Sequence, residues 1–168
     1  LMTGLSGKGV DCDMLCAEAE KGAAGDMQIN KHGNLMVCRT IKKVAATTFS
    51  MEMVTRLRRI CKDYDIIHIH HPDPMACLAL FLSGYKGKVV LHWHSDILKQ
   101  KFLLNIYKPL QSWLIRRADL IVGTTPVYVK ESSFLQSVQN KITYLPIGVP
   151  GFTPDPTLVQ EFRNNYLG

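Results

Sequence analysis

Residues 65–74, DIIHIHHPDP, decide the fold, because a short β-branched run ends there at two prolines. Such a run is typical of a strand, since β-branched side chains fit a pleated sheet and proline cannot donate to its ladder. A second apolar run, KVVLHWH, occupies residues 88–94. Five of the six histidines lie in these two runs, so the function of the histidines has to be considered together with the strands that carry them.

Strand and helix patterns alternate along the chain. Apolar runs predict strands at 10–17, 35–39, 65–71, 88–94, 119–125 and 141–149, and periodic patterns predict helices at 50–63, 75–83, 99–117, from 126 and at 157–167. Residues 18–34 are polar and glycine-rich and predict a solvated loop or hairpin. The alternation is typical of right-handed βαβ units, so we expect an α/β, Rossmann-like parallel sheet flanked by helices.

Composition narrows the class of protein. With 168 residues and 46% hydrophobic content, the chain can build one globular core. Its formal net charge of +6 suits an anionic partner such as a phosphate-bearing substrate or a membrane surface, and equally a generic basic surface. Five cysteines without a Cys-x-x-Cys pair indicate a reducing, cytoplasmic compartment.

Polar residues stand at the predicted ends of four strands. They are His70–Asp73, His94–Asp96, Thr124–Thr125 and Pro146–Gly148. Ligands of open α/β sheets bind outside the carboxyl ends of the strands. We therefore expect these four segments to converge on one cleft.

The two His-x-His pairs raise the question of a metal site. Alternation places His68 with His70, and His92 with His94, on one face, which gives a two-by-two array if the strands are neighbours. Such nitrogen-rich groups suit zinc or a binuclear hydrolase centre. A metal-dependent hydrolase is therefore one alternative function.

The sequence around the pairs argues against that alternative. A His-x-His-x-Asp-His motif would need aspartate and histidine where Pro72 and Asp73 stand. No histidine follows residue 94, so further ligands would have to be carboxylates such as Asp73 or Asp96. We predict no metal and interpret the mid-strand His68 and His92 as structural, with the intervening Trp93 as a core aromatic.

Three longer runs carry a family resemblance. They are DIIHIHHPDPMACLAL at 65–80, KGKVVLHWHSDILKQKFLLNIYKPLQSWLIRRADLIVGTTPVY at 86–128 and KITYLPIGV at 141–149. Over residues 5–168 the chain resembles the amino-terminal domain of retaining glycosyltransferases of family 4, which have the GT-B architecture. This resemblance implies that the family's first strand and glycine-rich loop come before residue 1.

The resemblance also implies a domain division and an activity. Residues 1–149 would form the Rossmann-like acceptor-side domain, and residues 150–168 the linker toward a donor-binding domain that the chain lacks. The enzyme would move a sugar from a nucleotide sugar to an acceptor hydroxyl with retention, in polysaccharide or glycolipid biosynthesis. It would use neither a metal nor another cofactor, and the isolated domain would be inactive. A non-catalytic Rossmann-like ligand-binding module is the second alternative.

By the same resemblance, His94 matches the strand-end histidine that contacts the transferred sugar or the attacking hydroxyl. A neutral imidazole there can donate one hydrogen bond and accept another. The remaining substrate-binding candidates are His70, His71, Asp73, Ser95, Asp96, Thr125 and Gly148. Thr125 is also placed to cap a helix, and Gly148 to permit a tight turn.

A basic stripe runs along the predicted helix at 99–117. It comprises Lys101, Lys108 and Arg116, with Lys99 and Arg117 nearby. It is either a solvated helix face or a contact for anionic lipid heads, which would place the enzyme at the inner face of the membrane beside a lipid-linked acceptor. Nucleic acid is not expected, because no binding motif accompanies the charge.

Overall fold

The computed structural model describes residues 1–44, 47–96, 101–148 and 154–166, with the backbone alone described for Val44 and for residues 101–106. The elements are α1 (Met2–Ser6), β1 (Met14–Ala17), β2 (Gly25–Asn30), β3 (Gly33–Cys38), β4 (Lys42–Val44), β5 (Thr47–Phe49), α2 (Met51–Ile60), η1 (Cys61–Asp63), β6 (Ile66–His71), α3 (Pro74–Ser83), β7 (Lys88–Trp93), α4 (Lys101–Arg117), β8 (Leu120–Gly123), α5 (Pro126–Glu131), η2 (Gln136–Lys141), β9 (Ile142–Tyr144) and α6 (Pro156–Tyr166).

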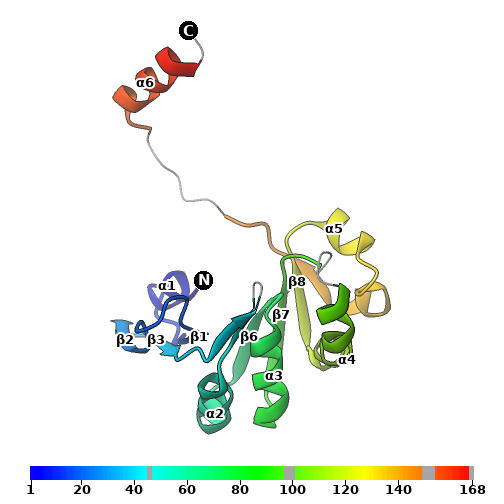
Figure 1. The fold of residues 1–168 in the computed structure, drawn as a ribbon. Helices are drawn as coiled ribbons and strands as arrows, with labels where there is room; N and C mark the ends of the chain where they lie inside the picture. The colour runs from blue at the N-terminus through cyan, green and yellow to red at the C-terminus, as the bar shows by residue number, and fades with distance from the viewer. Residues whose placement is uncertain (45–46, 97–100, 149–153, 167–168) are drawn as a thin grey trace.

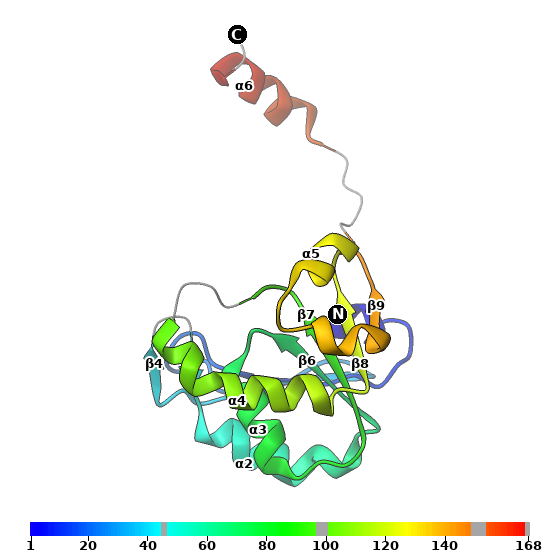
Figure 2. The same ribbon diagram turned by 90° about the vertical axis from the view of Figure 1, so that its right-hand side faces the viewer.

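A four-stranded parallel sheet, in the order β6-β7-β8-β9, organises the second half of the chain (Figure 1). Inward-facing residues of this sheet, such as Ile69 and Leu91, share one buried cluster with Leu80 of α3 and Leu114 of α4. Helices α3 and α4 therefore cover one face of the sheet, and Figure 2 shows them side by side. The predicted α/β class and its parallel strands are confirmed.

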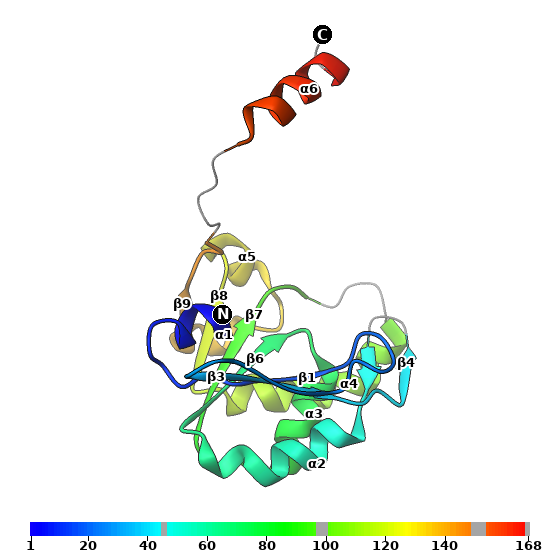
Figure 3. The ribbon, with the colours of Figure 1, turned by 90° about the vertical axis from the view of Figure 1, so that its left-hand side faces the viewer.

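The first half of the chain forms a separate three-stranded sheet in the order β1-β3-β2 (Figure 3). Strand β1 is parallel to β3, while β2 and β3 form an antiparallel hairpin. Strand β2 lies within the predicted loop or hairpin at 18–34, and β3 covers most of the strand predicted at 35–39. The mixed character of this sheet and the small β4–β5 hairpin were not predicted.

Side-chain caps set the starts of three helices. The side chains of Ser50, Asp73 and Thr125 each accept a backbone N–H in the first turn of α2, α3 and α5. These bonds satisfy donors that a helix start otherwise leaves unpaired. A proline inside a helix is expected to kink or interrupt it, but helix α4 runs on without interruption through Pro109. The start of that helix expected at residue 99 lies outside the described residues.

Helix α6 stands apart from both sheets and buries none of its residues (Figure 1). Its apolar side chains are open to solvent, with Phe162 57% exposed. Residues 150–153, which begin the linker predicted at 150–168, lie outside the described residues. The proposed division at residue 149 therefore stays a prediction.

Candidate functional site: an imidazole cluster at the strand ends

Four histidines share one face of the parallel sheet. Strands β6 and β7 are parallel neighbours with His70 opposite His92, and alternation puts His68 and His94 on the same side. The rings of His92 and His94 lie 4.1 Å apart between centroids, and those of His68 and His70 lie 4.8 Å apart. The predicted two-by-two array is present, and these four side chains are called the imidazole cluster below.

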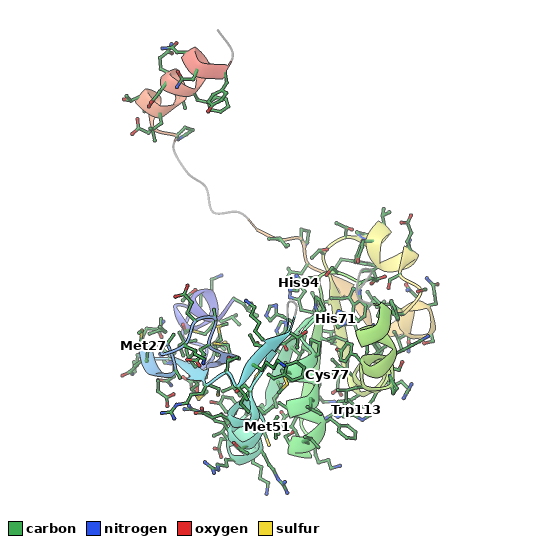
Figure 4. All side chains as sticks on the ribbon, in the orientation of Figure 1. Met27, Met51, His71, Cys77, His94 and Trp113 are labelled. Atoms are coloured by element: carbon green, nitrogen blue, oxygen red, sulfur yellow. The ribbon has the colours of Figure 1, made fainter. Side chains whose placement is uncertain are left out.

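A hydrogen bond joins the two strand ends within this cluster. Nδ1 of His70 lies 2.8 Å from Nε2 of His94, so one of these nitrogens donates and the other accepts. The ring of His70 is exposed and that of His94 is half-buried, near the carboxyl end of β7 (Figure 4). This pair is therefore open to a ligand on the solvent side of the sheet.

Burial keeps the inner members of the cluster neutral near pH 7. Desolvation, followed by the repulsion of neighbouring imidazoles, lowers the pKa of His68 and His92 to about 4. The pKa of His70 is lowered by the same two causes, with His94 as the repelling neighbour. Neutral imidazoles retain one lone pair each, so they can accept hydrogen bonds or bind a cation.

The nitrogens of the inner histidines are poorly satisfied. Nε2 of His68 and both ring nitrogens of His92 are buried without a hydrogen-bond partner among the described residues. The interpretation of these two residues as hydrogen-bonded structural histidines is thus not supported by contacts in the described part of the chain. Buried polar groups are nearly always paired, so these nitrogens require an explanation.

His71 lies on the opposite face from this cluster, because consecutive strand residues point to opposite sides. It is 1% exposed and stacks in parallel on Trp93, with centroids 3.7 Å apart. Its Nδ1–H donates to the carbonyl oxygen of Ser95 at 3.1 Å. Burial lowers its pKa to about 4. The structure therefore does not bring His71 to the rim with His94, as the sequence had suggested, but beneath it.

Asp96 makes its hydrogen bonds on the same side of the sheet as His71 and Trp93. Its carboxylate accepts the indole N–H of Trp93 at 2.8 Å and the hydroxyl of Ser132 at 3.0 Å. Its backbone N–H donates to the hydroxyl of Tyr128 at 2.5 Å. Both Tyr128 and Ser132 were missed in the sequence, because no local pattern marks a contact across more than 30 residues. These contacts fix the segment after β7 to the buried side of the sheet through Asp96. The neighbouring Ser95 is exposed.

Asp73, Thr125 and Gly148 do not join the imidazole cluster by any contact that the structure describes. Asp73 caps α3 by accepting the N–H of Ala76 at 2.9 Å, and Thr125 caps α5. Gly148 is exposed, a Cβ there would meet nothing within 4 Å, and its φ is not positive. The described backbone at Gly148 thus has no left-handed conformation that would require glycine, and the residues that follow it in the expected turn lie outside the described residues.

Comparison with known proteins places the chain in a family. The sequence pattern of Glycosyltransferase Family 4 matches residues 1–150. The chain belongs to this family. The resemblance inferred from the three sequence runs is thereby confirmed, and the parallel sheet agrees with half of a GT-B fold.

Two bacterial relatives are similar in sequence to this family 4 chain. The O-antigen chain mannosyltransferase C of Escherichia coli is 31% identical over 149 residues, covering 89% of this chain and 40% of the relative. The D-rhamnosyltransferase WbpZ of Pseudomonas aeruginosa is 32% identical over 128 residues, covering 75% of this chain and 34% of the relative. The chain thus spans less than half the length of either curated relative.

A solved structure supports the fold. A sucrose-phosphate synthase structure from Thermosynechococcus elongatus matches 99% of this chain and 90% of its own, with a TM-score of 0.58 and 14% identity. At that identity the likeness concerns the arrangement of the elements.

The predicted basic stripe of this family 4 chain is partly described. Lys108 and Arg116 are exposed on α4, while the side chain of Lys101 and all of Lys99 lie outside the described residues. Arg117 is half-buried and pairs with Asp119 at 3.2 Å. Among the described helices, none is long and apolar enough to span a bilayer.

Proposed function

We propose that the protein contributes the acceptor-side half of a retaining glycosyltransferase, which moves a sugar from a nucleotide sugar to an acceptor hydroxyl. Membership of family 4 supports the reaction class. The observation that carries the site is the 2.8 Å hydrogen bond between His70 and His94, which joins two strand ends on an open face. Ligands of parallel α/β sheets bind at that edge.

In this proposal, His94 contacts the transferred sugar or the attacking hydroxyl. Its Nε2 is engaged by His70, which leaves Nδ1 for a sugar hydroxyl. The bond to His70 fixes the ring orientation, so the contact is formed without a search over rotamers when the substrate binds. His94 acts on substrate in this scheme, and His70 acts as its partner and as a second sugar contact.

The names of the relatives suggest the sugar. One is a mannosyltransferase and the other a D-rhamnosyltransferase, and D-rhamnose is the 6-deoxy form of mannose. We therefore propose a nucleotide-activated sugar of the manno configuration as donor. An acceptor within a growing polysaccharide or lipid-linked glycan fits the printed name of the first relative. The exposed Lys108 and Arg116 would then approach anionic lipid heads.

The test is a transfer assay on the complete gene product that contains residues 1–168, with nucleotide-activated mannose and D-rhamnose and with EDTA present. His94→Ala should lower the transfer rate roughly tenfold or more, the scale of one lost transition-state contact. His32→Ala is the matched control, because His32 contacts Asp11 far from the cluster in sequence. Turnover of His94→Ala close to wild type, with the fold intact by circular dichroism, would remove His94 from the site.

EDTA separates this proposal from the alternatives. A metal-dependent hydrolase using the histidines would lose its activity in chelator, whereas sugar transfer should persist. A non-catalytic ligand-binding module would bind the nucleotide sugar without forming product. Product formation in EDTA is therefore the result that favours transfer over both.

A further inference from the structure

His68, His70 and His92 form the only group of three potential metal-binding side chains found in the described part of the chain. One ring nitrogen from each lies within 4.8 Å of the others. The three come from adjacent strands whose register is fixed by the β6–β7 ladder. The group is therefore set by the sheet and not by a mobile loop.

The spacing is close to that of a bound ion. Metal–nitrogen distances of about 2.0–2.1 Å in a tetrahedral site put ligand nitrogens about 3.4 Å apart. The ligand nitrogens here lie within 4.8 Å of one another, so the widest pair would have to close by up to about 1.4 Å through small rotations of the three side chains.

The hydrogen bonding of the group supports a cation between the rings. Nε2 of His68 and both nitrogens of His92 are buried, and no described residue pairs with them. A neutral imidazole carries one N–H and one lone pair, and a lone pair that no described residue pairs with can bind a metal ion directly. Ligation would satisfy one nitrogen on each ring that otherwise carries a desolvation cost.

His94 completes the surroundings of the group. A ligating histidine usually hydrogen-bonds through its other ring nitrogen, and His70 does so from Nδ1 to His94. Nε2 of His70 is then the ring nitrogen that remains to bind the ion. The nearby carboxylates are committed elsewhere, Asp96 to Trp93 and Asp73 to the start of α3. The donor set is therefore nitrogen only, which favours zinc, copper or nickel over magnesium or calcium.

We propose that His68, His70 and His92 bind one zinc-class transition-metal ion on the open face of the parallel sheet, with His94 as a positioning residue or fourth ligand. Metal binding is a different property from the transfer chemistry proposed above, which needs no metal, although the two share His70. Because His70 belongs to both, an ion bound there competes with a sugar for the same imidazole.

The experiment measures metal binding directly. Tag-free protein is stripped with EDTA, dialysed and titrated with Zn²⁺ by calorimetry, with Mg²⁺ as the control ion, and Co²⁺ absorption reports the coordination. Wild type should bind one Zn²⁺ per chain and show the visible bands of nitrogen-ligated Co²⁺. His70→Gln should weaken binding about tenfold or more, since even outer-shell partners contribute that much. His32→Gln should leave affinity and stoichiometry unchanged.

Three results would overturn the proposal. They are the absence of saturable Zn²⁺ binding at about 1 mM, an unchanged affinity in His70→Gln, or loss of binding in His32→Gln. His70 is exposed, so its substitution should leave the fold intact. His92→Gln, checked for folding by circular dichroism, should also abolish the Co²⁺ spectrum. Since no sugar enters these titrations, failure of the proposed transfer activity leaves this test unaffected.

Discussion

Mild acid should destabilise the fold through His71. The side chain is 1% exposed, stacks on Trp93 and donates from Nδ1 to the Ser95 carbonyl oxygen. Its Nε2 is buried with no partner among the described residues, so a second proton there would be both charged and unpaired. Burial accordingly lowers the pKa of His71 from the ordinary 6.5 to about 4.

The sign and size of the effect follow from linkage. Below pH 6.5 the unfolded chain takes up a proton at His71, while the folded chain does so only near pH 4. The free energy of unfolding therefore falls as the pH drops through this window. One pKa unit corresponds to about 1.4 kcal/mol, so His71 alone contributes a loss of about 2 kcal/mol by pH 5 and about 3 kcal/mol by pH 4. His68 and His92, whose pKa values are also lowered to about 4, act in the same direction.

Urea unfolding in EDTA, followed by tryptophan fluorescence at several pH values from 7.5 to 5, measures this loss. His71→Phe keeps an aromatic ring against Trp93 but cannot titrate, so it should lose about 2 kcal/mol less than wild type between pH 7 and pH 5. If wild type and His71→Phe lose equal stability over this range, His71 is not the group that titrates, and the reasoning fails.

Four substitutions at Asp96, Asp73 and Gly84 can be tested by urea unfolding at pH 7.5. Asp96→Ala should cost about 3 kcal/mol, because it leaves the buried indole N–H of Trp93 unpaired, and a neutral result would free Asp96 for a ligand. Asp73→Ala should cost about 1 kcal/mol as a lost helix cap, while Asp73→Asn should be nearly silent. Gly84→Ala should lower the free energy of unfolding by about 1 kcal/mol, because φ is +68°, a backbone conformation that alanine rarely adopts. A Cβ at this position would meet no atom, so no steric clash adds to that cost. An increase in stability would contradict this backbone conformation.

The sheet and its histidine array could be predicted because both follow from local patterns. Strands joined by a single helix are usually neighbours, so His70 opposite His92 follows from the βαβ order together with alternation. Helix starts at Ser50 and Thr125 were equally local, since a cap and its partner lie three residues apart. Such features depend on a few neighbouring residues and one regular period.

The amino-terminal sheet could not be predicted in the same way. The segments that follow its strands β1 and β3 are joined by Glu18, a buried residue. Its carboxylate accepts hydrogen bonds from the backbone N–H groups of Gly22, Ala24 and Thr40. In the sequence, Glu18 stands in a polar stretch and looks solvated. The contact with Thr40 spans 22 residues and forms only once β1 and β3 are parallel. A contact between residues so far apart in the chain produces no periodic pattern in the sequence from which it could be predicted.

The strand-end residues divide between two faces, and this division links stability to the proposed site. The backbone N–H of His94 donates to the carbonyl oxygen of His71 at 3.1 Å, between two residues whose side chains point to opposite faces. The segment that carries His94 is thus held from below by the His71–Trp93 stack and by Asp96. The 2.8 Å bond from His94 to His70 depends on that support. Substitutions on the buried face should therefore disturb the imidazole cluster although they touch neither a sugar nor a metal ion.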